Sequence, residues 1–169
     1  VADPKSDPCL ALRAAVAAAE FGLPIAPGTL QNLKSCPIDD RTWNDESRSL
    51  FLRLLASGPA LLQVWEEIDF VDIPGRLIPE WLAIRNRPSA SAAHRYTIDR
   101  HSVEVVTRLG RETPRGNRYD DRHYQALLLA GILHDVGKRP GVADHAAEGA
   151  RHASMVLKRM GFDRDIIWW

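Results

Sequence analysis

The stretch ALLLAGILHDVGK, residues 126–138, carries the strongest structural signal in this chain. Residues 126–133 form its most apolar segment and predict a buried helix, which His134 ends and Asp135 directly follows. An imidazole and a carboxylate at the buried end of a helix cost free energy unless something pairs them. A divalent cation can do so, because imidazole nitrogen and carboxylate oxygen are both ligands for Mn, Mg, Fe or Zn. We therefore predict that His134 and Asp135 turn toward one metal ion.

Helical patterns continue on both sides of this stretch, and no segment shows the convincing alternation of a strand. Residues 23–28 are predicted to form an extended linker, and residues 70–88 a loop that holds one short helix. Gly110 and Gly161 are expected to stop the helices that precede them. The predicted class is all-α, a helical bundle. The predicted helices span about residues 10–21, 45–56, 59–68, 79–84, 97–109, 120–133 and 144–160, and another begins near Asp163.

The composition fits one globular domain of ordinary kind. The chain has 169 residues, of which 45% are hydrophobic, and this is enough to bury a core. The 22 Lys and Arg balance the 22 Asp and Glu, so no basic excess points to a nucleic-acid polymer or a membrane surface as partner. The longest apolar stretch, residues 127–133, is far too short to span a bilayer.

The cysteines and the first residues bear on the compartment. Cys9 and Cys36 lack the spacing of a disulfide framework or a zinc site, so we expect two small core residues in a reducing cytoplasm. The opening Val1-Ala2-Asp3-Pro4-Lys5 has no initiator Met and no signal-peptide pattern. We expect a piece of a longer cytoplasmic protein.

A third histidine is expected on the same side as His134 and Asp135. In the helix that Thr97 or Asp99 is predicted to cap, His101 lies three residues after Ile98 and four before Val105. This spacing places His101 on the inward apolar stripe. It is a candidate third metal ligand, and a hydrogen-bonded core histidine is the alternative.

Lys138 and His145 are the predicted catalytic side chains. Lys138 lies in a loop whose glycines, Gly137 and Gly141, let the backbone approach a ligand closely. A lysine beside a dication can clamp a phosphate, so Lys138 is also predicted to bind substrate; a solvated loop lysine is the alternative. His145 opens the helix that Asp144 caps, where N–H groups favour anions. It could support a ligand, carry a proton or bind a second ion.

The remaining histidines have lesser predicted roles. His94 and Arg95 precede the His101 helix and are predicted to line the pocket and bind substrate. His123 is expected at the surface, and His152 is expected to pack internally. A metal beside phosphate-binding cations suits phosphoester hydrolysis, because the ion acidifies water and neutralises charge on the phosphoryl oxygens.

The site motifs resemble a known superfamily. His101, His134-Asp135 and the Gly137-Lys138 loop look like the HD superfamily of metal-dependent phosphohydrolases. More narrowly, His94-Arg95-Tyr96-Thr97-Ile98-Asp99-Arg100-His101 resembles the His-x-Tyr/Phe-Thr-Val-Asp-x-His signature of the bifunctional PII uridylyltransferase/uridylyl-removing enzymes. The run from Gly131 to Lys138 is similar to that family's central stretch, and other segments resemble its actinobacterial members.

The resemblance implies an HD-domain helical bundle that hydrolyses a phosphodiester. Residues 1–90 would be a helical and linker segment packed on an HD core of residues 91–169. The ligands would be His101, His134 and Asp135, holding a divalent metal (Mn or Mg, with Fe or Zn as alternatives). The family's last ligand is an Asp on a later helix, and Asp163 and Asp165 come too early to be its equivalent, so the HD core is expected to be C-terminally truncated.

The implied reaction removes a nucleotide from a protein. In the family, the HD domain releases UMP, or AMP in the actinobacterial branch, from a tyrosine of the PII signal protein in nitrogen regulation. The parent protein is also a nucleotidyltransferase. Two alternatives stay open: an HD phosphohydrolase of free nucleotides, and a catalytically silent regulatory HD module.

Overall fold

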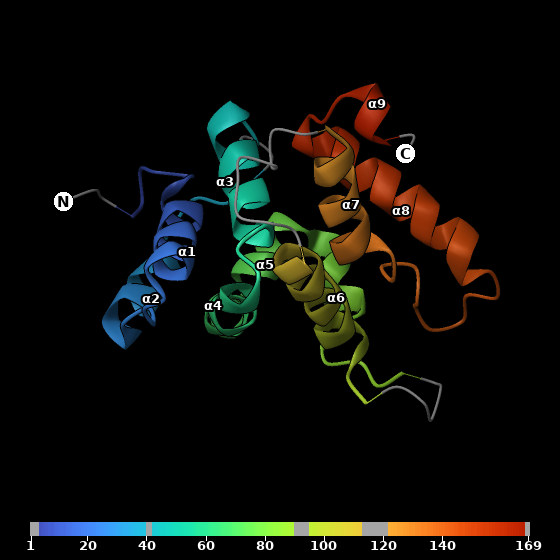
Figure 1. Cartoon of the computed structure of the whole chain (residues 1–169), viewed down its shortest axis with the longest axis horizontal. Helices are drawn as coiled ribbons and strands as arrows, with labels where there is room; N and C mark the ends of the chain where they lie inside the picture. The colour runs from blue at the N-terminus through green and yellow to red at the C-terminus, as the bar shows by residue number, and fades with distance from the viewer. Residues whose placement is uncertain (1–3, 40–41, 90–94, 113–121, 168–169) are drawn as a thin grey trace.

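The computed structural model describes residues 4–39, 42–89, 95–112 and 122–167, and helices build nearly all of this part of the chain. The chain winds from α1 and α2 at one end, through α3, α4 and α5 in the middle, to α6, α7, α8 and α9 at the other end (Figure 1). In chain order the elements are α1 (Leu10–Phe21), α2 (Pro27–Leu33), α3 (Asp45–Leu55), α4 (Pro59–Phe70), α5 (Ile73–Leu77), the 3₁₀ helix η2 (Pro79–Ala83), α6 (Ile98–Glu112), α7 (Arg122–Leu133), α8 (His145–Met160) and α9 (Arg164–Ile167).

The predicted all-α class is confirmed. Among the described residues there is no strand, and only an isolated antiparallel bridge joins Pro88 to Thr97. The helix ends follow local chemistry: Asp144 Oδ1 accepts hydrogen bonds from the backbone N–H groups of Ala146 and Ala147, which caps α8 as predicted. Gly161, with φ 76°, then ends α8 in the left-handed conformation that glycine adopts without strain.

Buried side chains from α1 through α9 form one continuous hydrophobic cluster. Trp65 and Trp81 pack edge to face within it, with ring centroids 5.3 Å apart. Cys9 and Cys36 are buried free thiols, as predicted. The predicted division of the chain at residue 90 falls within residues 90–94, outside the described ranges, and it stays a prediction.

Two segments contain a helix that was not predicted. Residues 23–28 were expected to be an extended linker, yet α2 begins at Pro27. The loop expected at residues 70–88 contains the predicted short helix near residues 79–84, which is η2, and also α5, which was not predicted. A proline stops a helix when it lies in the interior, but its fixed φ and missing N–H suit the first turn. Each of these short elements carries proline in its first turn, which the linker interpretation overlooked.

The prediction that Gly110 stops α6 is wrong, because the helix runs on to Glu112. A Cβ atom at Gly110 would lie 2.7 Å from the backbone nitrogen of Gly58. The glycine therefore allows α6 to pack closely against the turn between α3 and α4. Asp99 lies inside the first turn of α6 and does not cap it, whereas Thr97 directly precedes the helix. Asp120 and Asp121, the caps predicted for α7, lie outside the described residues.

Candidate metal centre

Helices α6 and α7 pack side by side and bring the three predicted ligands together. Gly131 permits this approach, because a Cβ atom there would meet Val106 and Leu109 of α6 at 3.0 and 3.1 Å. His101 lies in the first turns of α6, and His134 follows the last residue of α7. The antiparallel packing therefore places both imidazoles at the same end of the pair.

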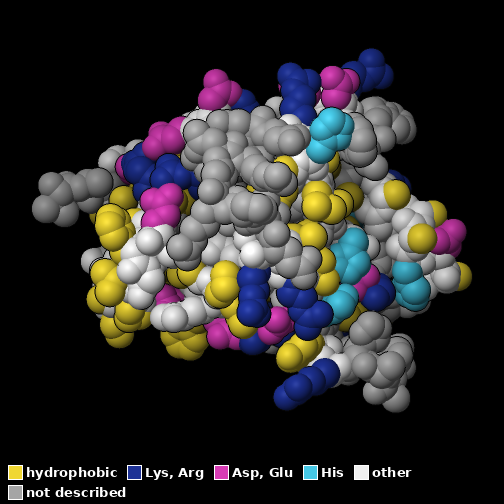
Figure 2. Space-filling view, viewed as in Figure 1, with side chains coloured by type: hydrophobic (Ala, Val, Ile, Leu, Met, Phe, Trp, Pro, Cys, Tyr) yellow, Lys and Arg dark blue, Asp and Glu magenta, His cyan; other side chains and the backbone are white. Residues whose placement is uncertain are grey.

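The candidate donor atoms form a compact group. His101, His134 and Asp135 each offer one ligand atom, and these atoms all lie within 4.8 Å of one another. The imidazole Nε2 of His134 is 3.3 Å from Oδ2 of Asp135. The rings of His101 and His134 pack edge to face, with their centroids 5.4 Å apart. Figure 2 shows histidine side chains gathered, among charged ones, where α6, α7 and α8 meet.

A backbone hydrogen bond orients the ring of His134. Its Nδ1 lies 2.9 Å from the carbonyl oxygen of Gly131, so Nδ1–H donates to that oxygen in the neutral ring. This tautomer leaves the lone pair on Nε2, the nitrogen that faces Asp135. Orientation of a ligating histidine by a backbone carbonyl is a recurring feature of metal sites. The helix end was expected to be buried. Asp135 is buried there, but the side chain of His134 is 36% exposed.

Asp135 is the buried anionic member of the group. Its side chain is 7% exposed, and Lys138 Nζ donates to its Oδ2 at 2.8 Å. Burial raises the pKa of this carboxyl, but the hydrogen bonds donated by Lys138 and by the doubly protonated ring of His134 outweigh burial and lower the pKa to about 2. The same contact with Asp135 raises the pKa of His134. Asp135 is thus a carboxylate at every physiological pH.

The donor set suits a divalent ion. Bonds of about 2.1 Å to one ion place its ligand atoms about 3 to 4.2 Å apart, so donors within 4.8 Å need only small side-chain adjustments. Two imidazoles with one carboxylate fit Mn, Fe or Zn, and fit Mg less well because Mg prefers oxygen. No other group of His, Cys, Asp or Glu with this geometry occurs in the described ranges.

The other predicted site residues are placed unequally. Lys138 joins the centre through Asp135, and His145 is exposed at the start of α8 outside the three-residue group. Arg95 is exposed, with its guanidinium 5.8 Å from the ring of Tyr96. His94 lies outside the described residues.

The remaining histidines have the expected surroundings. His123 is exposed, and His152 is 7% exposed within the core side of α8. Nε2 of His152 lies 2.8 Å from Oε1 of Glu148, one turn earlier on α8.

Gly137, which was predicted to let the backbone approach a ligand closely, makes a close contact with α8 beside the candidate metal centre. Gly137 lies against the first turns of α8, where a Cβ atom would be 2.4 Å from the carbonyl oxygen of His145 and 2.3 Å from the nitrogen of Gly149. The loop after Asp135 therefore touches α8 backbone to backbone. The signal in the sequence was the presence of Gly137 and Gly149. A glycine in a loop is common without any close contact, so this signal did not predict the contact.

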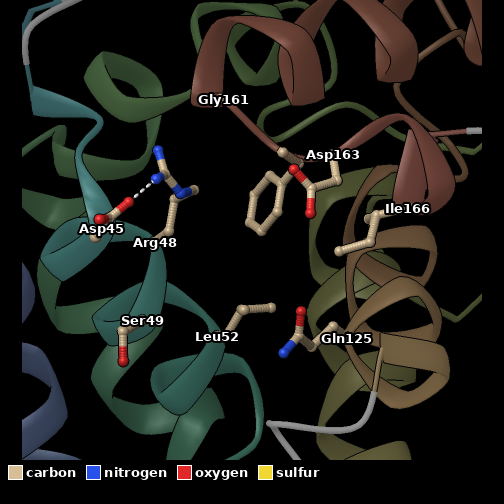
Figure 3. A pocket seen from close by; sticks show the side chains of 9 residues that line it. Asp45, Arg48, Ser49, Leu52, Gln125, Gly161, Asp163 and Ile166 are labelled. Carbon is tan, nitrogen blue, oxygen red and sulfur yellow. Dashed lines mark hydrogen bonds and ion pairs between the residues drawn. The ribbon is translucent and has the colours of Figure 1, made fainter.

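Of two clefts beside α7, one borders the candidate metal centre. One of about 250 Å³ runs between α7 and α8, beside His134, with walls of Ala, Leu and Ile. Another of about 360 Å³ lies between α3, α7 and the α8–α9 connection, and Figure 3 shows Asp45, Arg48 and Asp163 around it. None of the predicted site residues lines this larger cleft, which gives it no part in the metal centre.

Comparison with known proteins identifies relatives over nearly the whole chain. It is 40% identical over 164 residues, 96% of its length, to the bifunctional uridylyltransferase/uridylyl-removing enzyme of Streptomyces coelicolor. The enzymes of the same name from Mycobacterium tuberculosis and Corynebacterium glutamicum are 38% and 34% identical over 161 residues, 95% and 94% of this chain. The chain spans about a fifth of these relatives: 19% of the first two and 22% of the third.

Two further comparisons gave no match. No family model matches the sequence, and no solved structure matches it significantly. Among the described helices, each is too short or too polar to cross a bilayer.

Proposed function

We propose that this chain, which is a domain of the bifunctional uridylyltransferase/uridylyl-removing enzymes, carries out the nucleotidyl-removing reaction as a metal-dependent HD phosphohydrolase. The proposed substrate is a PII signal protein that carries UMP or AMP on a tyrosine, in the cytoplasm. The observation that supports it best is the convergence of His101, His134 and Asp135 from two helices. The uridylyl-removing activity in the relatives' name is a hydrolysis that such a centre suits.

The three residues would hold a divalent ion, with Mn or Mg proposed. When bound, such an ion supplies Lewis acidity, which makes water a nucleophile at neutral pH and offsets charge on phosphoryl oxygens. The protein contributes the geometry: Gly131 orients the ring of His134, and burial holds Asp135 in place. The ionised carboxylate supplies the negative charge that would attract a dication, in competition with Lys138.

Lys138 is the proposed phosphate clamp. Its ammonium group is 2.8 Å from Asp135 and 34% exposed, so it can turn from the carboxylate to a phosphoryl oxygen. His145, exposed at the start of α8, is proposed to carry a proton at the mouth of the site. His94 and Arg95 are proposed to contact the nucleotide.

The leaving group makes modest demands on the enzyme. Water adds its oxygen to phosphorus, the bond from phosphorus to the tyrosine oxygen breaks, and the phenolate takes up a proton. A phenol has a pKa of about 10, so its anion leaves more readily than an aliphatic alkoxide. Charge stabilisation is therefore a larger requirement than general-acid catalysis.

The test is release of UMP or AMP from nucleotidylated PII by the purified protein, with and without Mn²⁺. We expect Mn²⁺-dependent release that Asp135→Asn and His134→Ala each lower by about 10²-fold or more, because the ion loses a ligand. Asp163→Asn is the matched control, since Asp163 is an exposed carboxylate outside the centre. Helical circular dichroism checks that each variant folds.

The outcome separates the candidate functions. Hydrolysis of free nucleotides with no action on modified PII would move the assignment to a nucleotide phosphohydrolase. Absence of bound metal, with no Mn²⁺ effect on stability or activity, would indicate a regulatory module instead.

A further inference from the structure

A cavity of about 200 Å³ with acidic and apolar walls lies between α4, η2 and α6, apart from the metal centre. It is lined by Trp65 of α4, Trp81 of η2, and Asp69 and Asp99, after which we name it the Asp69–Asp99 cavity. None of the three metal-centre residues lines it. Exposed Asn86 also contributes to the wall, so the cavity reaches the surface.

Unpartnered polar atoms concentrate at this cavity. In the part of the chain that the structure describes, six buried side-chain polar atoms have no hydrogen-bond partner. Four belong to residues that line it: Nε1 of Trp65, Nε1 of Trp81, Oδ1 of Asp69 and Oδ1 of Asp99. Buried polar groups are nearly always paired in folded proteins, so four orphans in one wall indicate a polar occupant.

Three of the four residues that carry these atoms are buried, which makes the missing partners costly, and the side chain of the fourth, Asp69, is 20% exposed. Trp65 is 4% exposed, Trp81 1% and Asp99 8%. Asp99 is held from its other side, since Oδ2 accepts the backbone N–H of Asn86 at 2.7 Å. Asn86 adopts φ 54° to aim that N–H, a left-handed conformation that asparagine tolerates better than most residues.

The cavity carries surplus negative charge. Asp69 pairs with Nε of Arg85 at 3.0 Å, but the same guanidinium also pairs with Asp72 at 3.2 Å. Burial raises the pKa of Asp69, Arg85 opposes this rise, and the nearby charges of Asp99 and Asp72 add to it, so that the pKa lies above its ordinary value. The cation at the rim, Arg100, is already engaged by Glu66 and Glu104.

We infer that the Asp69–Asp99 cavity binds a primary alkylammonium group, with the ammonium between the two carboxylates and its stem against the indole rings. Aromatic faces and carboxylates together are the surroundings that organic cations prefer. Ammonium N–H donors would satisfy the two orphaned carboxylate oxygens, and accompanying water would accept from the indole N–H groups. Leu62 and Val103 in the wall suit an aliphatic stem.

A metal ion fits this cavity less well. Divalent ions that bind oxygen take about six ligands, whereas two carboxylates here meet walls of tryptophan, leucine and valine. The cavity is independent of the metal centre, so its occupancy can be tested whether or not the chain hydrolyses a nucleotide.

The test is titration of the ¹⁵N-labelled protein with n-butylammonium chloride, followed through the indole N–H resonances of its five tryptophans. We expect saturable shifts of two resonances, assigned to Trp65 and Trp81 by Trp→Phe replacement. Equal concentrations of NaCl control for ionic strength, and 1-butanol is the neutral analogue of similar size. We expect the alcohol to bind at least about tenfold more weakly than the ammonium.

Variants locate the charge that matters. Asp99→Asn should weaken binding of n-butylammonium by about tenfold, and Asp165→Asn, an exposed carboxylate elsewhere, should leave it unchanged. A peptide with one central lysine distinguishes the two sources of the ammonium group. If the peptide binds more tightly than n-butylammonium, the ligand is a lysine of a partner protein. If it binds more weakly, the ligand is a free amine.

Either of two results would overturn the inference. Equal affinity for 1-butanol and n-butylammonium would show that the cavity does not select for a cation. Shifts of the indole resonances that never saturate would show that the cavity does not bind the ammonium and holds ordered water instead. Both readouts use the wild-type protein, so the inference stays testable even if Asp99→Asn does not fold.

Discussion

Gly137 and Gly149 meet backbone to backbone: a Cβ atom at Gly137 would lie 2.3 Å from the nitrogen and 2.6 Å from the Cα of Gly149. The relationship is not symmetrical, because a Cβ atom at Gly149 would stand 3.5 Å from the carbonyl oxygen of His134, an ordinary contact distance. The loop that follows Asp135 is thereby held against α8, and the position of the metal centre depends on the absence of one methyl group.

Replacing Gly137 by Ala should therefore destabilise the protein by about 1–3 kcal/mol or more, because backbone atoms on both sides cannot yield as a side chain would. Gly149→Ala, in the interior of α8, is the matched control and should be neutral or slightly stabilising, since alanine favours helix. Urea unfolding at neutral pH measures both. Equal changes in the free energy of unfolding for the two substitutions would contradict the difference in space between Gly137 and Gly149.

Metal binding should stabilise the folded protein through the three-residue centre. At a Mn²⁺ concentration 100 times the dissociation constant, we expect a gain of about 2.7 kcal/mol, which thermal unfolding detects as a rise in Tm. Asp135→Asn should abolish most of this gain, because it removes the anionic ligand. Asp163→Asn should retain it. A Tm of Asp135→Asn that still rises with Mn²⁺ as in wild type would place the ion elsewhere.

Lys138 should affect metal binding and hydrolysis in opposite directions. Lys138 competes with a cation for Asp135, so Lys138→Met should tighten Mn²⁺ binding by about 3- to 10-fold. As the proposed phosphate clamp it should also contribute to turnover, so kcat/KM should fall by about 10- to 100-fold. Lys158→Met, at an exposed position of α8, controls for loss of charge. Unchanged hydrolysis by Lys138→Met would leave the clamp unsupported.

The ion pair between Glu80 and Arg159 should make stability depend on acidity. Burial raises the pKa of Glu80, but two hydrogen bonds from Arg159, at 2.9 and 2.6 Å, outweigh burial and lower it below its ordinary value. A lowered folded-state pKa means that the stabilisation is complete above the unfolded-state pKa and is lost as pH falls through the folded value.

Glu80→Gln should therefore cost about 1–3 kcal/mol at pH 7 and progressively less between about pH 5 and pH 3. Urea unfolding across this range compares the variant with wild type. Glu66→Gln, an exposed glutamate, is the control and should show a smaller effect. A cost that does not shrink at low pH would assign the role of Glu80 to packing.

Local sequence predicted most of the helices and the three side chains that the fold brings together. Asp144 and Gly161 bound α8 as expected, because caps and stops act within a few residues of themselves. The prediction failed where one residue type is compatible with two local structures. Pro27 begins a helix and does not end a linker, and Gly110 allows a close contact between helices and does not end α6.

By itself, the sequence determined which side chains could bind a metal, since His101 lies on an apolar stripe and His134-Asp135 ends an apolar helix. Periodicity gives the face of a helix but carries no distance between helices. Tertiary packing at Gly131 decided that α6 and α7 approach closely enough to group the three donor atoms within 4.8 Å. It also decided that Lys138 contacts Asp135, and that Asp69 and Asp99, thirty residues apart, share one cavity. Such contacts depend on shape complementarity between distant segments, which no local pattern encodes.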